Sequence, residues 1–151
     1  MDLSLDNSAT VLMSGGIDST ACLHFLAKQG GNVQGALIDY GQAAAAAERQ
    51  AARALAAHMD VPLIVYDVQG GPTFGSGELK GRNAFLIFAA LFLTRVNSGL
   101  IAIGIHAGSP YYDCSPPFID TMAQLIADHT DGQIKLIAPL AQMKLPLTDH
   151  P

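Results

Sequence analysis

A short run of small and hydroxyl-bearing residues near the start of the chain has the composition of an anion-binding turn. The run reads Ser14, Gly15, Gly16, Ile17, Asp18 and Ser19. Its glycines let the backbone turn tightly and approach a bulky anion. Because a helical pattern follows, the first helical amides have no partner within the helix and lie at the positive end of its dipole. The run therefore predicts a phosphate or pyrophosphate site, with hydroxyl groups as further donors.

Asp18 is the acidic residue in this run, and a carboxylate beside a bare phosphate is unfavourable. It fits either as a cap of the helix or as a ligand of a divalent ion that neutralises the pyrophosphate. The plainer interpretation is a simple turn followed by a first-turn carboxylate. The run is neither a Walker A loop, which ends in Gly-Lys-Ser or Gly-Lys-Thr, nor the G-x-G-x-x-G of dinucleotide-binding folds.

Three further segments place polar residues beside the expected site. They are Asp39-Tyr40-Gly41-Gln42, Gly81-Arg82-Asn83, and the loop that contains His106, Tyr112, Asp113 and Cys114. His106 is the histidine that could carry a proton near neutral pH at this position. The five histidines show no metal-ligand spacing such as H-E-x-x-H.

Short apolar runs alternate with longer helical patterns along the whole chain. We expect strands over 9–13, 33–39, 62–68, 100–105 and 134–137. We expect helices over 17–29, 43–58, 82–97 and 117–129, and loops over 69–81 and 107–116. This order predicts an α/β fold, a five-stranded parallel doubly wound sheet with helices on both faces. Ligands of such sheets bind beyond the carboxyl ends of the strands, where these polar segments lie.

Composition limits the class of protein. The 151 residues are 50% hydrophobic with a net charge of −5, which opposes general nucleic-acid binding and fits an oligomer. The most apolar stretch, 84–93, is too short to span a bilayer, and no early segment resembles a signal peptide, so we expect a cytoplasmic protein.

The two cysteines are too few for a disulfide framework or an all-cysteine zinc site, and Cys22 fits core packing. We expect one domain over 1–140 and an irregular tail over 141–151.

The string S-G-G-x-D-S at 14–19 resembles the PP-loop of the ATP pyrophosphatase superfamily. Its members cleave ATP between the α and β phosphates and transiently adenylate a substrate. The other motifs, D-Y-G-Q at 39–42, G-R-N at 81–83 and Y-D-C at 112–114 followed by Pro117-Phe118-Ile119, resemble the 7-cyano-7-deazaguanine synthase family of the queuosine pathway. The four motifs occur in the family's order over about residues 9 to 140, and the resemblance implies a Rossmann-like, adenine nucleotide alpha hydrolase-like sheet.

The resemblance also implies a reaction. Members of the family adenylate the carboxylate of 7-carboxy-7-deazaguanine with ATP and magnesium. Ammonia then gives an amide, and a second ATP helps to convert the amide to the nitrile. The implied cofactors of this chain are therefore ATP and Mg²⁺, its implied partner is a small-molecule acid, and its implied assembly is a homodimer.

Site residues carry over from the family by position. The implied phosphate and catalytic residues are Ser14, Gly15, Gly16, Ile17, Asp18, Ser19 and Arg82. The backbone of Leu37 and Ile38 would face adenine, and Arg82 would reach a phosphate or the substrate carboxylate. The implied substrate residues are Gln42, Arg82, His106, Tyr112, Asp113 and Cys114.

Each of these residues also has a plainer role. Asp39 and Tyr40 would then only end a strand and pack, and Arg82 would pair with a surface carboxylate. Asn83 would cap a helix, and Cys114 would be an unreactive, partly buried thiol.

The sequence departs from the family pattern on its substrate side. The family's four C-terminal zinc-binding cysteines have no counterpart in it, so zinc is not supported. The Arg-His that usually follows D-Y-G-Q is replaced by Ala43 to Ala47, and Lys144 is the nearest match to a later lysine. Two alternatives therefore stay open. One is a nucleotide-binding module without turnover that acts through a partner. The other is a PP-loop enzyme acting on transfer RNA, which the acidic charge opposes.

Overall fold

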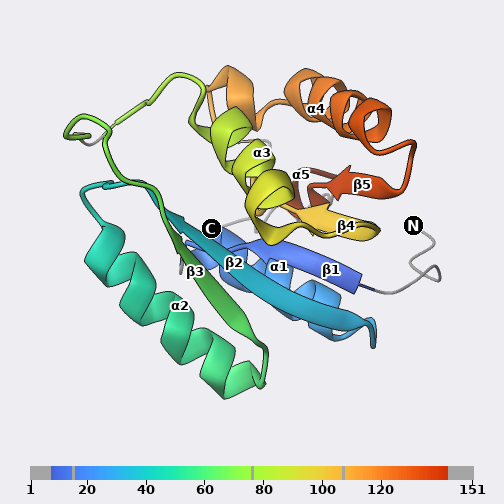
Figure 1. The fold of residues 1–151 in the computed structure, drawn as a ribbon, viewed down its shortest axis with the longest axis horizontal. Helices are drawn as coiled ribbons and strands as arrows, with labels where there is room; N and C mark the ends of the chain where they lie inside the picture. The colour runs from blue at the N-terminus through green and yellow to red at the C-terminus, as the bar shows by residue number, and fades with distance from the viewer. Residues whose placement is uncertain (1–7, 15, 76, 107, 143–151) are drawn as a thin grey trace, which may run out of the picture.

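The computed structural model describes residues 8–14, 16–75, 77–106 and 108–142. Five parallel strands form one sheet in the order β3-β2-β1-β4-β5 (Figure 1). The strands are β1 (Ser8–Leu12), β2 (Asn32–Asp39), β3 (Leu63–Asp67), β4 (Gly99–Ala102) and β5 (Ile134–Ile137). The helices are α1 (Ile17–Ala27), α2 (Ala45–Met59), α3 (Arg82–Thr94), α4 (Pro116–His129) and α5 (Pro139–Gln142), with a 3-10 turn η1 (Tyr112–Cys114). The predicted five-stranded parallel sheet is confirmed.

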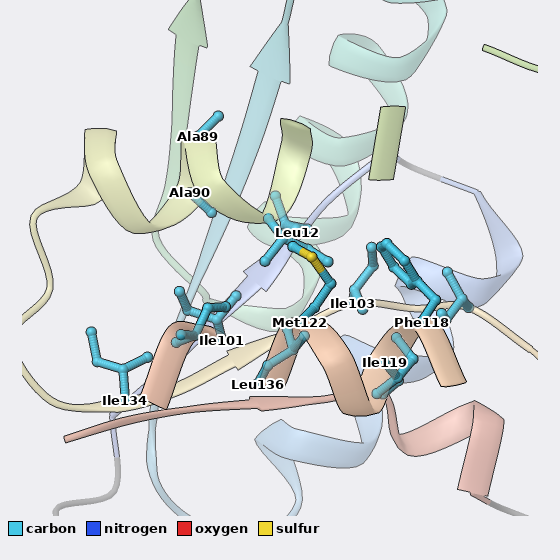
Figure 2. Packing of buried hydrophobic residues seen from close by; sticks show 14 of the residues in the cluster. Leu12, Ala89, Ala90, Ile101, Ile103, Phe118, Ile119, Met122, Ile134 and Leu136 are labelled. Carbon is cyan, nitrogen blue, oxygen red and sulfur yellow. The ribbon is translucent and has the colours of Figure 1, made fainter. Parts of the chain in front are cut away.

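Helices cover both faces of the sheet, as the sequence predicted. Neighbouring strand residues point to opposite faces, so Val11 packs with α1 and α2 while Leu12 packs with α3 and α4. Ile101 and Ala102 divide in the same way. Figure 2 shows the larger cluster, in which Ile101 lies near Met122 of α4 and Leu12. Both faces are therefore buried, which explains the continuous apolar strands.

Several predicted ends were wrong by a few residues, for local reasons. The expected strand 100–105 ends at Ala102, although Ile103 and Ile105 are buried. Both side chains belong to the core cluster on the face that α3 and α4 cover, and the Ile103 amide still donates to the Ile137 carbonyl at 3.0 Å. The expected helix 82–97 ends at Thr94, because Arg95 adopts a left-handed conformation with φ of 54°. The predicted helix 117–129 begins one residue earlier, where the Ser115 hydroxyl accepts a hydrogen bond from the Phe118 amide.

The strand order places a crevice between two particular strands. The chain moves outward from β1 through β2 to β3, then returns to the other side of β1 to build β4 and β5. At this reversal the connections after β1 and β4 leave toward opposite faces of the sheet, which is where α/β folds bind ligands. The ends of β1 and β4 therefore hold the candidate site.

The remaining predictions about the chain's organisation concern its C-terminal end and its helices. The expected boundary at residue 140 falls within α5, and residues 143–151, which include Lys144 and His150, lie outside the described part. None of the helices in the described ranges combines the length and the apolar character that a bilayer span requires.

Candidate functional site

A cavity of about 360 Å³ opens at the carboxyl edge of the sheet, beside the ends of β1, β2 and β4. Its charged and titratable lining side chains are Asp18, Glu48, Arg82, His106, Tyr40, Tyr111 and Cys114. Other lining residues include Ser14, Ser19, Ile38, Gln42, Asn83, Gly104 and Ser109. Residues from four of the predicted segments thus meet in one concave site.

The first turn of α1 leaves its amides open to this region. Gly16 is the N-cap residue, and no side chain caps the helix. The buried Ser19 hydroxyl instead fixes the turn, accepting from the Ser14 amide at 3.3 Å and donating to the Gly16 carbonyl at 3.2 Å. Ser14 and Gly16 are exposed, and Ile17 is 88% exposed. The Gly16 amide donates to the Ser14 hydroxyl at 3.3 Å, Gly15 lies outside the described residues, and anion binding at this uncapped helix start stays a prediction.

Asp18 does not cap its helix, so that alternative is wrong. Its carboxylate Oδ2 lies 2.8 Å from Nδ1 of His106, which follows β4. Two residues before His106, Gly104 passes so close to α1 that an added Cβ would lie 2.5 Å from the Asp18 carbonyl oxygen. A side chain at position 104 would therefore push the loop after β4 away from the first turn of α1.

The segment Asp39-Tyr40-Gly41-Gln42 is folded upon itself. Asp39 Oδ1 accepts from the Gly41 amide at 3.0 Å, and Gln42 Oε1 accepts from the Tyr40 amide at 2.9 Å. Gln42 Nε2 donates to the Ile38 carbonyl and to Glu48 Oε2. The Gln42 side chain lines the cavity, but both N–H groups of its amide are already hydrogen-bonded, one to Ile38 and one to Glu48 of α2.

Arg49 joins this segment to the next strand, although no motif in the sequence pointed to it. Its Nε lies 2.8 Å from Asp39 Oδ2, and its terminal nitrogen pairs with Asp67 at the end of β3. The Gly41 amide, and then Arg49, hold the pKa of the Asp39 carboxyl below its ordinary value. Asp39 is therefore a structural residue, which agrees with its plainer interpretation.

Arg82 lines the cavity from the start of α3 and forms no ion pair with another residue that the structure describes. Its guanidinium lies beside Tyr40, whose pKa is raised by burial more than the neighbouring arginine lowers it. The interpretation of Arg82 as a partner of a surface carboxylate is thus not realised within the described chain. Its charge remains available to an anionic ligand.

Asn83 and Asp113 contact each other, and it is Asp113 and not Asn83 that caps the start of α3. The Asn83 side chain, 4% exposed, donates to the Asp113 carbonyl at 2.9 Å instead of capping its own helix. The Asp113 carboxylate accepts from the Asn83 amide and so serves the first turn of α3. This mutual contact attaches η1 to α3.

The predicted substrate residues therefore divide into two groups. Gln42, Arg82, His106 and Cys114 line the cavity, but Tyr112 and Asp113 do not. Tyr112 is 64% exposed and packs edge-to-face on Phe118. Tyr111 and Ser109 line the cavity instead, and nothing in the sequence distinguished adjacent tyrosines.

The expected adenine contacts differ from each other in position. Ile38 lines the cavity, whereas the Leu37 side chain is fully buried on the opposite face of the sheet. Because the Ile38 carbonyl accepts from Gln42, it is partly occupied already. Adenine recognition by this backbone stays a prediction.

The two cysteines have different surroundings. Cys22 is fully buried in α1, and burial raises the pKa of its thiol to about 12, which confirms its packing role. Cys114 is half-buried, with its sulfur 3.8 Å from Asn83 Nδ2. No three His, Cys, Asp or Glu side chains gather as a metal site in the ranges that the structure describes.

This chain is similar to known proteins both in sequence and in fold. The sequence matches the family described as queuosine biosynthesis protein QueC over residues 8–79 and 73–146. Proteins named 7-cyano-7-deazaguanine synthase are similar to it. The one from Acetivibrio thermocellus is 30% identical over 89% of this chain and 72% of the relative. The one from Novosphingobium aromaticivorans is 32% identical over 90% of this chain and 70% of the relative.

A solved structure shares the fold. It is the predicted subunit of tRNA methyltransferase from Methanocaldococcus jannaschii, with a TM-score of 0.54 over 90% of this chain and 69% of that one. Its sequence identity is 16%, so the likeness concerns architecture alone.

Proposed function

This chain belongs to the queuosine biosynthesis protein QueC family, and from that membership we propose that it is an ATP-dependent enzyme of the 7-cyano-7-deazaguanine synthase type. In this proposal it adenylates the carboxylate of a deazapurine acid, ammonia displaces AMP to give the amide, and a second ATP helps to convert the amide to the nitrile. One observation carries the proposal. Ser14, Asp18 and Ser19 after β1 line the same cavity as Arg82 of α3, a cation that forms no ion pair within the described part of the chain.

The chain's own groups would act mainly by position and charge. The open amides at the start of α1 would hold the β and γ phosphates. Arg82 would stand where the acid's carboxylate meets the α phosphate and would stabilise the charge that develops there. ATP supplies the chemistry that turns a carboxylate oxygen into part of a leaving group, with release of pyrophosphate.

Magnesium fits this site as an ion carried by the nucleotide. Mg²⁺ is usually held by one or two carboxylates together with substrate phosphates. The cavity offers Asp18 and Glu48, of which Asp18 lies in the same turn as the open amides. Asp18 is accordingly the residue that would hold the ion.

The test is pyrophosphate release from ATP in the presence of 7-carboxy-7-deazaguanine and ammonia. We expect acid-dependent release, and loss of activity when Ser14→Ala and Asp18→Ala are combined. The proposal fails if ATP is never cleaved between its α and β phosphates with this acid or related ones.

A nucleotide-binding role without turnover is the alternative, and the substrate-side loop favours it. Asp113 and Asn83 hydrogen-bond to each other, and neither Tyr112 nor Asp113 lines the cavity. Tight ATP binding by calorimetry without any product would support this alternative.

Formation of a homodimer is a further proposal, which sedimentation equilibrium tests.

A further inference from the structure

A second cavity of about 270 Å³ lies next to the one just described. The two share Tyr40 and Arg82 in their linings, so they lie on either side of these residues. The second cavity is bounded by the end of β3, the loop 69–81 and the first turns of α3. Two of the sequence motifs reach it through Tyr40 and Gly81-Arg82, but the sequence analysis assigned no ligand to this position.

Three aromatic rings gather here. Tyr40 packs edge-to-face against Phe74 at 5.2 Å and against Phe85 at 5.7 Å between ring centroids. Val68 and Leu79 complete the apolar surface. Perpendicular rings leave parts of their faces uncovered, and a flat ring can stack on such a face. The shape and the chemistry of the lining therefore suit a planar heterocycle.

The charged lining residues of this cavity are both cationic. They are Lys80 and Arg82, and no acidic residue lines the cavity among those described. Two cations suit a ring that carries a carboxylate better than they suit a neutral ring. Arg82 also borders the anion-binding turn's cavity, so a carboxylate held there would lie between the two cavities.

We propose that this aromatic pocket binds the ring of a planar heteroaromatic acid and presents its carboxylate at Arg82 to the nucleotide in the neighbouring cavity. The inference rests on the proposed function, and it moves the ring site from the Tyr112–Cys114 loop to the far side of Tyr40. The carboxylate oxygen would then attack the α phosphate beside Arg82 and form the bond to AMP, while the bond between the α and β phosphates breaks and pyrophosphate leaves.

The experiment measures two affinities by calorimetry in the full chain. One is that of a non-hydrolysable ATP analogue with magnesium, and the other is that of 7-carboxy-7-deazaguanine added afterwards. We compare Phe85→Ala and Phe74→Ala with Phe92→Ala, since Phe92 lies on the same helix as Phe85 but is 81% exposed and outside both cavities. We expect the first two changes to weaken acid binding by about tenfold, as loss of a stacking partner does, with analogue affinity within twofold. Phe92→Ala should change neither.

Three results would overturn the inference. The first is an acid affinity that is unchanged in both pocket variants. The second is a wild-type protein that binds the analogue but not the acid. The third is a fall in the analogue affinity alone, which would place adenine in this pocket. Failure of the proposed function has a different signature. In that case acid and analogue bind with the expected dependence on Phe85, but no pyrophosphate is released.

Discussion

Asp18 and His106, 88 residues apart in the chain, contact each other through Oδ2 and Nδ1 at 2.8 Å. Both side chains are about half exposed within the cavity, and their contact joins the turn after β1 to the loop after β4. Because Nδ1 faces the carboxylate, Nε2 is the ring nitrogen left for a ligand. The pair thus fixes the orientation of two groups at the expected phosphate site.

Replacing His106 with alanine should lower kcat/KM for pyrophosphate release by about tenfold, because the Asp18 carboxylate loses the partner that orients it. Asp18→Asn should cost more, about a hundredfold, since it also removes the charge. His58→Ala, on the exposed side of α2, is the matched control and should act like the wild type. Wild-type rates in His106→Ala would show that the contact has no part in catalysis.

Replacing Gly104 with alanine should destabilise the protein by about 1–3 kcal/mol, the usual cost of overpacking. The new Cβ would lie 2.5 Å from the Asp18 carbonyl oxygen and 2.8 Å from the Ser19 nitrogen. Both atoms belong to the backbone, so α1 or the loop must move, and affinity for the ATP analogue should fall too. Urea denaturation and calorimetry measure the two effects. Gly75→Ala has open space around the new Cβ and serves as the control, and equal behaviour of the two variants would refute the clash.

Removing the Arg49 charge should weaken the fold at neutral pH, because Asp39 and Asp67 lose their shared partner. The folded-state pKa of Asp39 is depressed, so its contribution is present above the ordinary value of 3.8 and is lost as pH falls through the folded pKa. The difference in unfolding free energy between wild type and Arg49→Gln should accordingly shrink in acid. Denaturation at a series of pH values gives this difference. Arg53→Gln, exposed on the same helix, should lie within about 0.5 kcal/mol of wild type throughout. A gap for Arg49→Gln that is constant with pH would contradict the assignment.

Truncating Asn83 to alanine should cost about 1–3 kcal/mol, since the Asp113 carbonyl loses its donor in a nearly buried place. The attachment of η1 to α3 would also loosen, and Cys114 should then react faster with a thiol reagent. Denaturation and labelling kinetics give the two readouts. Asn97→Ala, exposed after α3, is the comparison and should change neither. Unaltered labelling in Asn83→Ala would mean that other contacts hold η1.

Native protein should be modified by a thiol reagent at Cys114 and not at Cys22. Full burial excludes the reagent from Cys22, and the pKa of about 12 keeps its thiol protonated. Mass spectrometry of peptides identifies the modified residue. Addition of denaturant should expose Cys22 to the reagent, and rapid labelling of Cys22 without denaturant would contradict the buried position.

The sequence predicted the sheet well because its strands are buried on both faces and so appear as uninterrupted apolar runs. The same signal misled at 103–105, since burial and strand pairing leave an identical pattern in Ile103 and Ile105. The turn at Ser14 could be predicted because a local string suffices to form it. Contacts between residues far apart in the chain could not be predicted. Arg49 illustrates why, since its two partners belong to different strands.

The direction in which side chains point could not be predicted from the sequence either. Asp113 and Asn83 are 30 residues apart, and only the tertiary structure reveals that they satisfy each other. Tyr111 and Tyr112 are indistinguishable by type, yet only the first lines the cavity. The roles assigned to Ser14, Asp18, Ser19 and Arg82 remain predictions about catalysis, and the experiments above address them.

The pairing of β1 with both β2 and β4 has a consequence for how the protein is made. During synthesis the glycine-containing turn leaves the ribosome early, but Gly104 and His106, which complete its surroundings, follow almost ninety residues later. Nascent chains that stop before β4 would carry the whole signature string without the groups that face it. The proposed nucleotide affinity should therefore appear only after the second half of the chain has packed against the first.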